Sequence, residues 1–397
     1  MMRGNGGDRP YHSTDYLESL DSIDAEILTE LSRCDPRNIS LLAREVKRPI
    51  ETVRYRYNRM ARILNLRLTS YVVYSKLGLK RLSVFCHLSP KQLKAVGKAL
   101  ENLDYWTYLA RFYGVTDGYY GVYAIPAEQS DFLVKYLATM SQSGLLKNYS
   151  AYTTSDPHVI AANFSGFDFT HHTWRFEWSK WLGELDKPAE TTPQGLGDPS
   201  DFSVSADRVC MKVLERIEDN SATSFVEIAS AIGLTPQDIR YHYFRHILGR
   251  GIISGFRPTI LPYPRSYANA YTLCLKFHDR KSMENFAGWL SSSFIAMSYA
   301  KVIGEDSLIV HSYLPMIEEN KMHDFLFRMS EAGYLDDYYY MPIDTGSFKG
   351  WSIRSEKFDG EGWPMNQEVY LRGLREIIEH SAPEQKPPVP AAQLKSQ

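Results

Sequence analysis

The apolar residues near the start of the chain recur at helical spacing. Between residues 21 and 33 they fall on one face, and Asp21 stands before them as a helix cap. Residues 39–46 repeat the helical pattern, a break follows at 47–49, and residues 50–64 are helical again. The inward stripe of this third helix is Val53, Tyr57, Met60 and Leu64. Three helices with a tight turn before the last predict a helix-turn-helix.

A mixed pattern begins at residue 81. Strand-like segments at 82–88, 105–113, 119–125 and 145–153 alternate with helical segments at 90–103 and 127–140. This order, βαββαβ, is that of the ferredoxin-like fold.

Both patterns then recur. Residues 53–59 (VRYRYNR) match residues 239–245 (IRYHYFR) at an offset of 186. The second helix-turn-helix continues at 252–256 into a β-prone segment that resembles a wing. Strands at 270–278, 294–303, 306–313 and 334–342 then alternate with helices near 280–291 and 317–331. We interpret the chain as a tandem duplication of a two-part unit.

The predicted fold class is therefore α+β, with two tandem units, each a winged helix-turn-helix domain followed by a ferredoxin-like βαββαβ domain of the RAM or ACT type. The aromatic residues of 158–182 are expected to pack on the core, residues 183–203 to form an exposed linker, and the Pro-rich end to be disordered. The expected domains are 20–75, 80–155, 156–203 (aromatic extension and linker), 206–260, 268–343, 344–380 (C-terminal extension) and 381–397 (tail).

Composition adds limits. The 397 residues carry 45 Lys and Arg against 47 Asp and Glu, so any affinity for nucleic acid must come from local clustering. Without an apolar run long enough to span a bilayer, or an apolar core of a signal peptide at the N-terminus, we expect a cytoplasmic protein with no membrane contact. The four cysteines form no C-x-x-C pair and have no histidine at zinc-ligand spacing, so we expect them to be buried apolar residues and expect no metal site and no cofactor.

Basic residues cluster around the first predicted recognition helix. Residues 44–67 hold eight basic and two acidic side chains, a local excess that a solvated helix of mixed sign does not show. Arginine pairs with phosphate or guanine and asparagine suits adenine, which indicates double-stranded DNA as a partner. The candidate DNA-binding residues here are Arg44, Lys47, Arg48, Arg54, Tyr55, Arg56, Asn58, Arg59 and Arg62. The second recognition helix has fewer, namely Arg240, Tyr241, His242 and Arg245, so we expect the first to dominate.

The order of parts resembles the leucine-responsive and asparagine-synthesis regulator family, Lrp/AsnC, over residues 20–155 and 206–343. Local similarities are IGLTPQDIR (232–240), RGIISGF (250–256) and the turns GVTD (114–117) and GED (304–306). The resemblance implies a DNA-binding transcriptional regulator or an architectural protein of the nucleoid. Family members pair through their βαββαβ sheets, so one chain here would act as a pseudo-dimer with its two sheets face to face. The resemblance leaves open whether such chains assemble into further homo-oligomers. An effector such as an amino acid would bind near Gly114, Asp117, Gly304 and Asp306.

The same fold also occurs in haem-pathway decarboxylases, which are the alternative. Such an enzyme needs a cluster of histidine, tyrosine and arginine at a large cleft. The His-Asn-Tyr signature of those enzymes is not found near the second strand, so we expect no catalytic residues and no enzyme activity. Candidates under the alternative are His87, Arg111, Tyr119, Tyr120 and Tyr123.

Overall fold

The first helix-turn-helix forms where the sequence predicts it. The computed structural model describes residues 19–63, 66–114, 116–171, 173–185, 196–199, 201–259, 263 and 267–381. Its first three helices are α2 (Ser22–Glu30), α3 (Ile39–Glu45) and α4 (Ile50–Ile63). Asp21 caps α2 by accepting hydrogen bonds from the backbone of Ile23 and Asp24. The inward faces meet in one core, which includes Ile27, Leu28, Leu42, Val53 and Met60.

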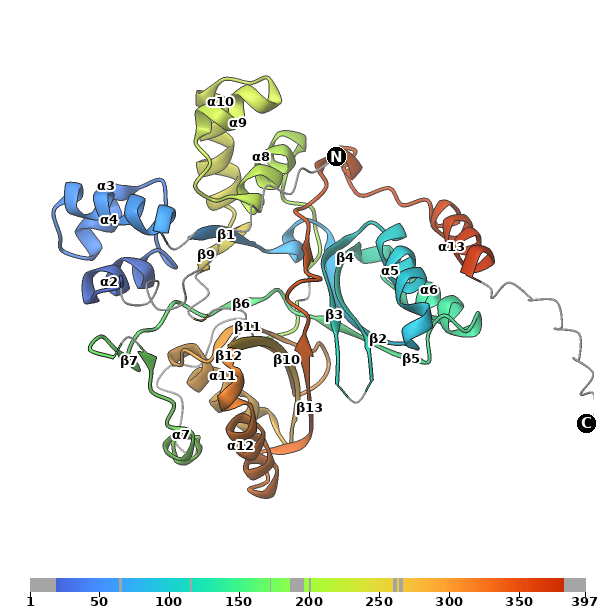
Figure 1. Ribbon diagram of the computed structural model, residues 1–397. Coiled ribbons are helices and arrows are strands. Elements are labelled where there is room, and N and C mark those ends of the chain that lie inside the picture. The colour runs from blue at the N-terminus through green and yellow to red at the C-terminus, as the bar shows by residue number, and fades with distance from the viewer. Residues whose placement is uncertain are drawn as a thin grey trace, which may run out of the picture.

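The second helix-turn-helix contains α8 (Arg208–Asp219), α9 (Phe225–Ile232) and α10 (Pro236–Tyr241), which continues as a π-helix, η4 (His242–Leu248). Capping boxes start α9 and α10, and Gly233 ends α9 at φ 73°. After each last helix comes one strand, β1 (Arg67–Val72) or β9 (Ile253–Thr259), and the two strands pair antiparallel. The two helix-turn-helix domains are therefore joined by a shared ribbon (Figure 1).

The order βαββαβ occurs twice, which confirms the predicted fold class. The first set is β2 (Leu79–His87), α5 (Leu93–Asn102), β3 (Trp106–Phe112), β4 (Gly118–Pro126), α6 (Asp131–Gln142) and β5 (Asn148–Thr154). The second set is β10 (Ala268–Phe277), α11 (Arg280–Ser292), β11 (Ala296–Lys301), β12 (Ser307–Pro315), α12 (Glu319–Glu331) and β13 (Leu335–Ile343). Short 3₁₀ turns lie at Tyr74–Lys76, Pro90–Gln92, Ala127–Gln129, Met316–Glu318 and Ser355–Lys357. The strands of the two sets order as β5-β2-β4-β3 and β13-β10-β12-β11, and the pairing of β3 with β13 makes these two four-stranded sheets one continuous sheet.

The two sheets face one another, as expected from the resemblance. Their edges meet where Phe112 of β3 pairs with Ile343 of β13, and where Thr154 pairs with Val302. Between them lies an apolar layer with members from both sheets, and the helices cover the outer faces (Figure 1). The residues of this layer are Phe85, Ala110, Phe112, Tyr120, Val122, Cys274, Val302, Ile309, Met341 and Ile343.

The aromatic segment after β5 packs inward, as predicted. It contains β6 (His158–Val159), which pairs with β11, the short hairpin β7 (Phe167–Asp168) and β8 (Thr173–Trp174), and α7 (Trp178–Glu184). Phe167 and Trp174 join the core of the first helix-turn-helix, while Trp178 and Trp181 join the core of the second sheet domain. The segment therefore ties these two parts together.

The predicted exposed linker is wrong in part. Residues 186–195 and 200 lie outside the described residues, but Leu196 is buried in the core of the second sheet domain. Asp198 Oδ1 lies 2.6 Å from the buried Lys301 Nζ. An apolar side chain and an acid with a buried cationic partner hold this stretch against the fold.

The C-terminal extension covers the first sheet domain. β14 (Lys349–Gly350) pairs with β3, and α13 (Gln367–Ser381) packs on α5 and α6. The expected disordered tail lies outside the described residues beyond Ser381. Within the described part of the chain no helix has the length and apolar character to cross a membrane.

Candidate nucleic-acid interface

The recognition helix α4 turns one face to the core and the other to solvent. Val53 and Met60 are buried, which sets the orientation of the helix. Tyr55 on the opposite face keeps 65% of its surface exposed. The predicted DNA-binding residues that this face exposes are Arg54, Tyr55, Asn58 and Arg62.

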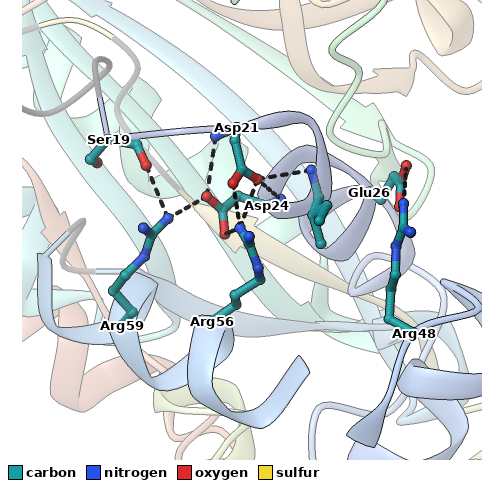
Figure 2. Close-up of polar contacts among 8 residues, drawn as sticks. Ser19, Asp21, Asp24, Glu26, Arg48, Arg56 and Arg59 are labelled. Carbon is teal, nitrogen blue, oxygen red and sulfur yellow. Dashed lines mark hydrogen bonds and ion pairs between the residues drawn. The ribbon is translucent and has the colours of Figure 1, made fainter. Parts of the chain in front are cut away.

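Arg56 and Arg59 point elsewhere. Arg56 Nη1 lies 2.6 Å from Asp21 Oδ2 and 3.1 Å from Asp24 Oδ1, and Arg59 also pairs with Asp24 (Figure 2). Arg59 donates a further hydrogen bond to the carbonyl of Ser19. These two arginines were predicted to bind DNA, but in the structure they fasten α4 to α2.

The acids at the junction of α2 and α4 explain why Arg56 and Arg59 point toward α2. Asp24 is fully buried, and a buried carboxylate without a partner is costly. Partial burial opposes the ionisation of Asp21, but the hydrogen bond and charge of Arg56, together with hydrogen bonds from the backbone of Asp24 and Ile23, outweigh burial and lower the pKa of that carboxyl. Sequence periodicity cannot reveal such a pairing, because Asp24 and Arg56 come from different helices.

The other basic residues predicted to bind DNA in the first domain stay on the surface. Arg44 pairs with Glu45, Arg54 pairs with Glu51, and Arg48 lies 3.3 Å from Glu26 (Figure 2 shows the last pair). Exposed pairs of this kind are worth about 0–1 kcal/mol, so a phosphate can replace the acid. Lys47 is exposed in the turn between α3 and α4, where its φ is 52°.

The second recognition helix exposes a more apolar face. Arg240, Tyr241 and Arg245 are exposed, as predicted for DNA contacts. Phe244 is exposed beside them, with the Arg240 guanidinium 5.3 Å from the centre of its ring. His242 is an exception, because it turns inward to face Cys210 and Asp207. The same position of the first domain, 186 residues earlier, is the inward-facing Arg56.

The proposed effector residues lie in two hairpin turns. Gly114 and Asp117 are exposed between β3 and β4, and Gly304 and Asp306 lie between β11 and β12. Gly304 has φ 79°, and the Asp306 carbonyl accepts a hydrogen bond from Phe277 N. These are features of tight turns, and an effector role stays a prediction.

A polar group that the sequence analysis missed lies between the two sheets. Tyr120 Oη is 3.3 Å from His311 Nε2, and Thr272 Oγ1 is 3.4 Å from His311 Nδ1. Burial, with Arg81 and Arg257 nearby, lowers the pKa of His311 to about 3, so this imidazole is neutral. The buried Nε and Nη1 of Arg81 have no hydrogen-bond partner among the described residues. The period-2 spacing of Arg81, Ser83 and Phe85 on β2 was the available signal, because it places all three on the same face of the sheet.

Of the five residues named for a decarboxylase, the structure brings only Tyr120 into this polar group. Tyr123 donates to the carbonyl of Leu100, His87 bonds to Thr116, and Arg111 pairs with Asp344. Tyr119 packs against Gly97 of α5 on the other side of the sheet.

Comparison with known proteins adds the following. No protein-family model and no curated protein matches the chain. Solved structures of the siroheme decarboxylase NirDL cover 90% of this chain and 99% of that one, at 13% identity and a TM-score of 0.47. An AsnC family transcriptional regulator from Agrobacterium tumefaciens covers 34% of this chain and 89% of that one, at 18% identity and a TM-score of 0.27. A transcriptional regulator from Neisseria meningitidis, solved with L-Met, also covers 34% of this chain and 89% of its own, at 13% identity and a TM-score of 0.28.

These likenesses concern the fold. The arrangement of helix-turn-helix and βαββαβ domains occurs both in Lrp/AsnC regulators and in an enzyme. The expectation that the chain is not an enzyme is contradicted by the likeness over most of its length to siroheme decarboxylase, and it is withdrawn.

The orientation of the arginines predicts two different effects on stability. Replacing Arg56 and Arg59 together by alanine leaves the buried Asp24 without a cation and should lower the free energy of unfolding by about 3–5 kcal/mol. Replacing the exposed Arg54 and Arg62 together should change it by less than about 0.5 kcal/mol. Urea unfolding followed by circular dichroism measures both. Equal, small effects of the two double substitutions would contradict the assignment.

Proposed function

We propose that the chain is a regulator that binds double-stranded DNA as a single-chain pseudo-dimer, with the first recognition helix supplying most of the affinity. The observation that carries this proposal is the outer face of α4, where Arg54, Tyr55, Asn58 and Arg62 are exposed side by side. Guanidinium groups suit phosphates and guanine, and an exposed amide suits adenine. Lys47 and the exposed arginines of α3 and its turn extend the basic surface toward a DNA backbone.

The paired wings support the use of both domains on one duplex. β1 and β9 pair over six positions, so the two helix-turn-helix domains share one ribbon instead of moving independently. Two linked recognition elements raise affinity, because the second binding event is intramolecular.

The two recognition faces differ in charge, which supports an asymmetric mode of binding. Among the described residues of 44–64, five basic side chains are exposed (Arg44, Lys47, Arg48, Arg54 and Arg62), whereas the matching residues 230–250 expose three (Arg240, Arg245 and Arg250). Phe244 on the second face suits a thymine methyl or a protein surface better than a phosphate. The expected site is therefore not palindromic.

Salt dependence tests this proposal. Binding of a duplex should weaken with salt, and the Arg54→Ala/Arg62→Ala variant should reduce the slope of log affinity against log salt by about 0.9 for each phosphate that it no longer neutralises. Arg240→Ala/Arg245→Ala should reduce both slope and affinity less. Fluorescence anisotropy titrations at several salt concentrations give the slopes. A slope unchanged in Arg54→Ala/Arg62→Ala, or an equal weakening of binding by the two variants, would contradict the proposal.

A second candidate function is the binding and decarboxylation of a carboxylate-bearing substrate between the two sheets. It rests on the buried Nε and Nη1 atoms of Arg81, which have no hydrogen-bond partner among the described residues and suit a carboxylate, beside the neutral His311 and the Tyr120 hydroxyl. A neighbouring pocket, lined by Cys274, Ile309 and Tyr339 among others, encloses about 90 Å³. This is below the about 300–1,000 Å³ of most ligand sites, so a tetrapyrrole enters only if the surrounding side chains move.

Sirohaem, the substrate class of the NirDL enzyme, is the probe for this candidate. If the candidate holds, adding the full chain to sirohaem changes its absorption spectrum and yields a product that has lost carbon dioxide. Arg81→Met should abolish both effects, while Lys80→Met, on the other face of β2, should leave them intact. An unchanged spectrum together with unaltered sirohaem by mass spectrometry would exclude it and would leave the DNA-binding proposal untouched.

A further inference from the structure

Four potential metal ligands converge inside the second helix-turn-helix. They are Asp207, which caps α8, Cys210 in the first turn of α8, and His242 and His246, which are four residues apart on η4. One ligand atom from each lies within 4.8 Å of all the others. The Cys210 side chain is fully buried, and both imidazoles are largely buried beside it.

Four of the six separations between these atoms are close to the edges of a tetrahedron around one small ion. Cys210 Sγ lies 3.4 Å from His242 Nδ1 and 3.7 Å from His246 Nδ1. Asp207 Oδ2 lies 3.4 Å from His242 Nδ1 and 3.3 Å from His246 Nδ1. Zinc bonds of about 2.3 Å to sulfur and about 2.0–2.1 Å to nitrogen or oxygen give tetrahedral edges of about 3.3–3.6 Å. The four side chains are thus already placed as ligands.

The matching junction of the first domain contains a positive charge that the cluster in the second domain lacks. At an offset of 186 residues, Asp207 corresponds to Asp21, Cys210 to Asp24 and His242 to Arg56. In the first domain a guanidinium bridges the two acids and fastens the recognition helix to the first helix (Figure 2). In the second domain the same place holds a carboxylate and a thiol, but imidazoles instead of arginine. A bound cation would restore the missing positive charge.

We propose that Asp207, Cys210, His242 and His246 bind one zinc ion, which fastens the second recognition helix to α8. A thiolate with two imidazoles selects zinc over magnesium or calcium, which prefer oxygen ligands. Four protein ligands complete the tetrahedral shell, as in structural zinc sites. The Cys210 thiol releases its proton to solvent as the zinc–sulfur bond forms.

This proposal departs from the expectation of no metal site. That expectation rested on the absence of C-x-x-C pairs, whereas the four proposed ligands occur as D-x-x-C at the start of α8 and H-x-x-x-H on η4. The H-x-x-x-H spacing of His242 and His246 was the signal that could have indicated it, because residues four apart share one face of a helix.

Metal content and cobalt spectroscopy test the proposal directly. The full chain, purified without a metal-affinity tag, should contain one zinc per molecule. After zinc is removed, Co²⁺ should produce a thiolate-to-cobalt band in the near ultraviolet and the intense visible bands of tetrahedral cobalt. Cys210→Ser should remove the thiolate band and His246→Asn should lower the zinc content, whereas Cys34→Ser, a buried cysteine of the first domain, should change neither.

Stability gives a second measurement that does not depend on how well the variants fold. Removing zinc from the wild-type chain with a chelator should lower its melting temperature, and adding zinc back should restore it. A wild-type chain that carries no zinc, shows no thiolate-to-cobalt band and melts at the same temperature with and without added zinc would overturn the proposal. The four side chains would then form only a hydrogen-bonded cluster.

Discussion

The apolar layer between the two sheets fixes the positions of all other parts of the molecule. Phe85, Tyr120 and Ile309 are among its members, and the sheet edges meet at both sides of it. Because the two sheets are held face to face, the strands β1 and β9 that lead into them run side by side and pair. The two helix-turn-helix domains are attached to that ribbon, so the packing of the sheets decides where the recognition helices lie (Figure 1).

Each recognition helix needs a second constraint, which is its attachment to the first helix of its own domain. In the first domain this attachment consists of Arg56 and Arg59 on the buried Asp24, and in the second it is the group around Cys210. Equivalent positions in the two domains thus attach the recognition helix to the first helix through different side chains. As a result, part of the basic cluster that the sequence shows around α4 serves the fold, and a smaller set of exposed side chains remains available for the proposed DNA contacts.

Local pattern predicted the helices and strands well. The alternation of strands and helices identified both βαββαβ domains, and apolar residues at helical spacing identified the helices of the first helix-turn-helix domain. The direction of charged side chains was harder to predict. A helical wheel places Arg56 on the flank of its own helix, but it does not show that Asp24 of another helix lies beside it. For the same reason the polar group around His311 and the convergence of Cys210 with His246 escaped prediction, since each joins residues distant in sequence.

The most direct test of the proposed function is cleavage of bound DNA by an iron chelate attached at single cysteines. The four native cysteines are buried, so a reagent should react selectively at Tyr55→Cys on α4, at Tyr241→Cys on α10, or at Phe327→Cys on α12 as a control. We predict strong cleavage of the duplex from position 55, weaker cleavage of a separate segment of the same duplex from position 241, and none from position 327. Cleavage no stronger from positions 55 and 241 than from position 327, on DNA that the protein binds, would contradict this account.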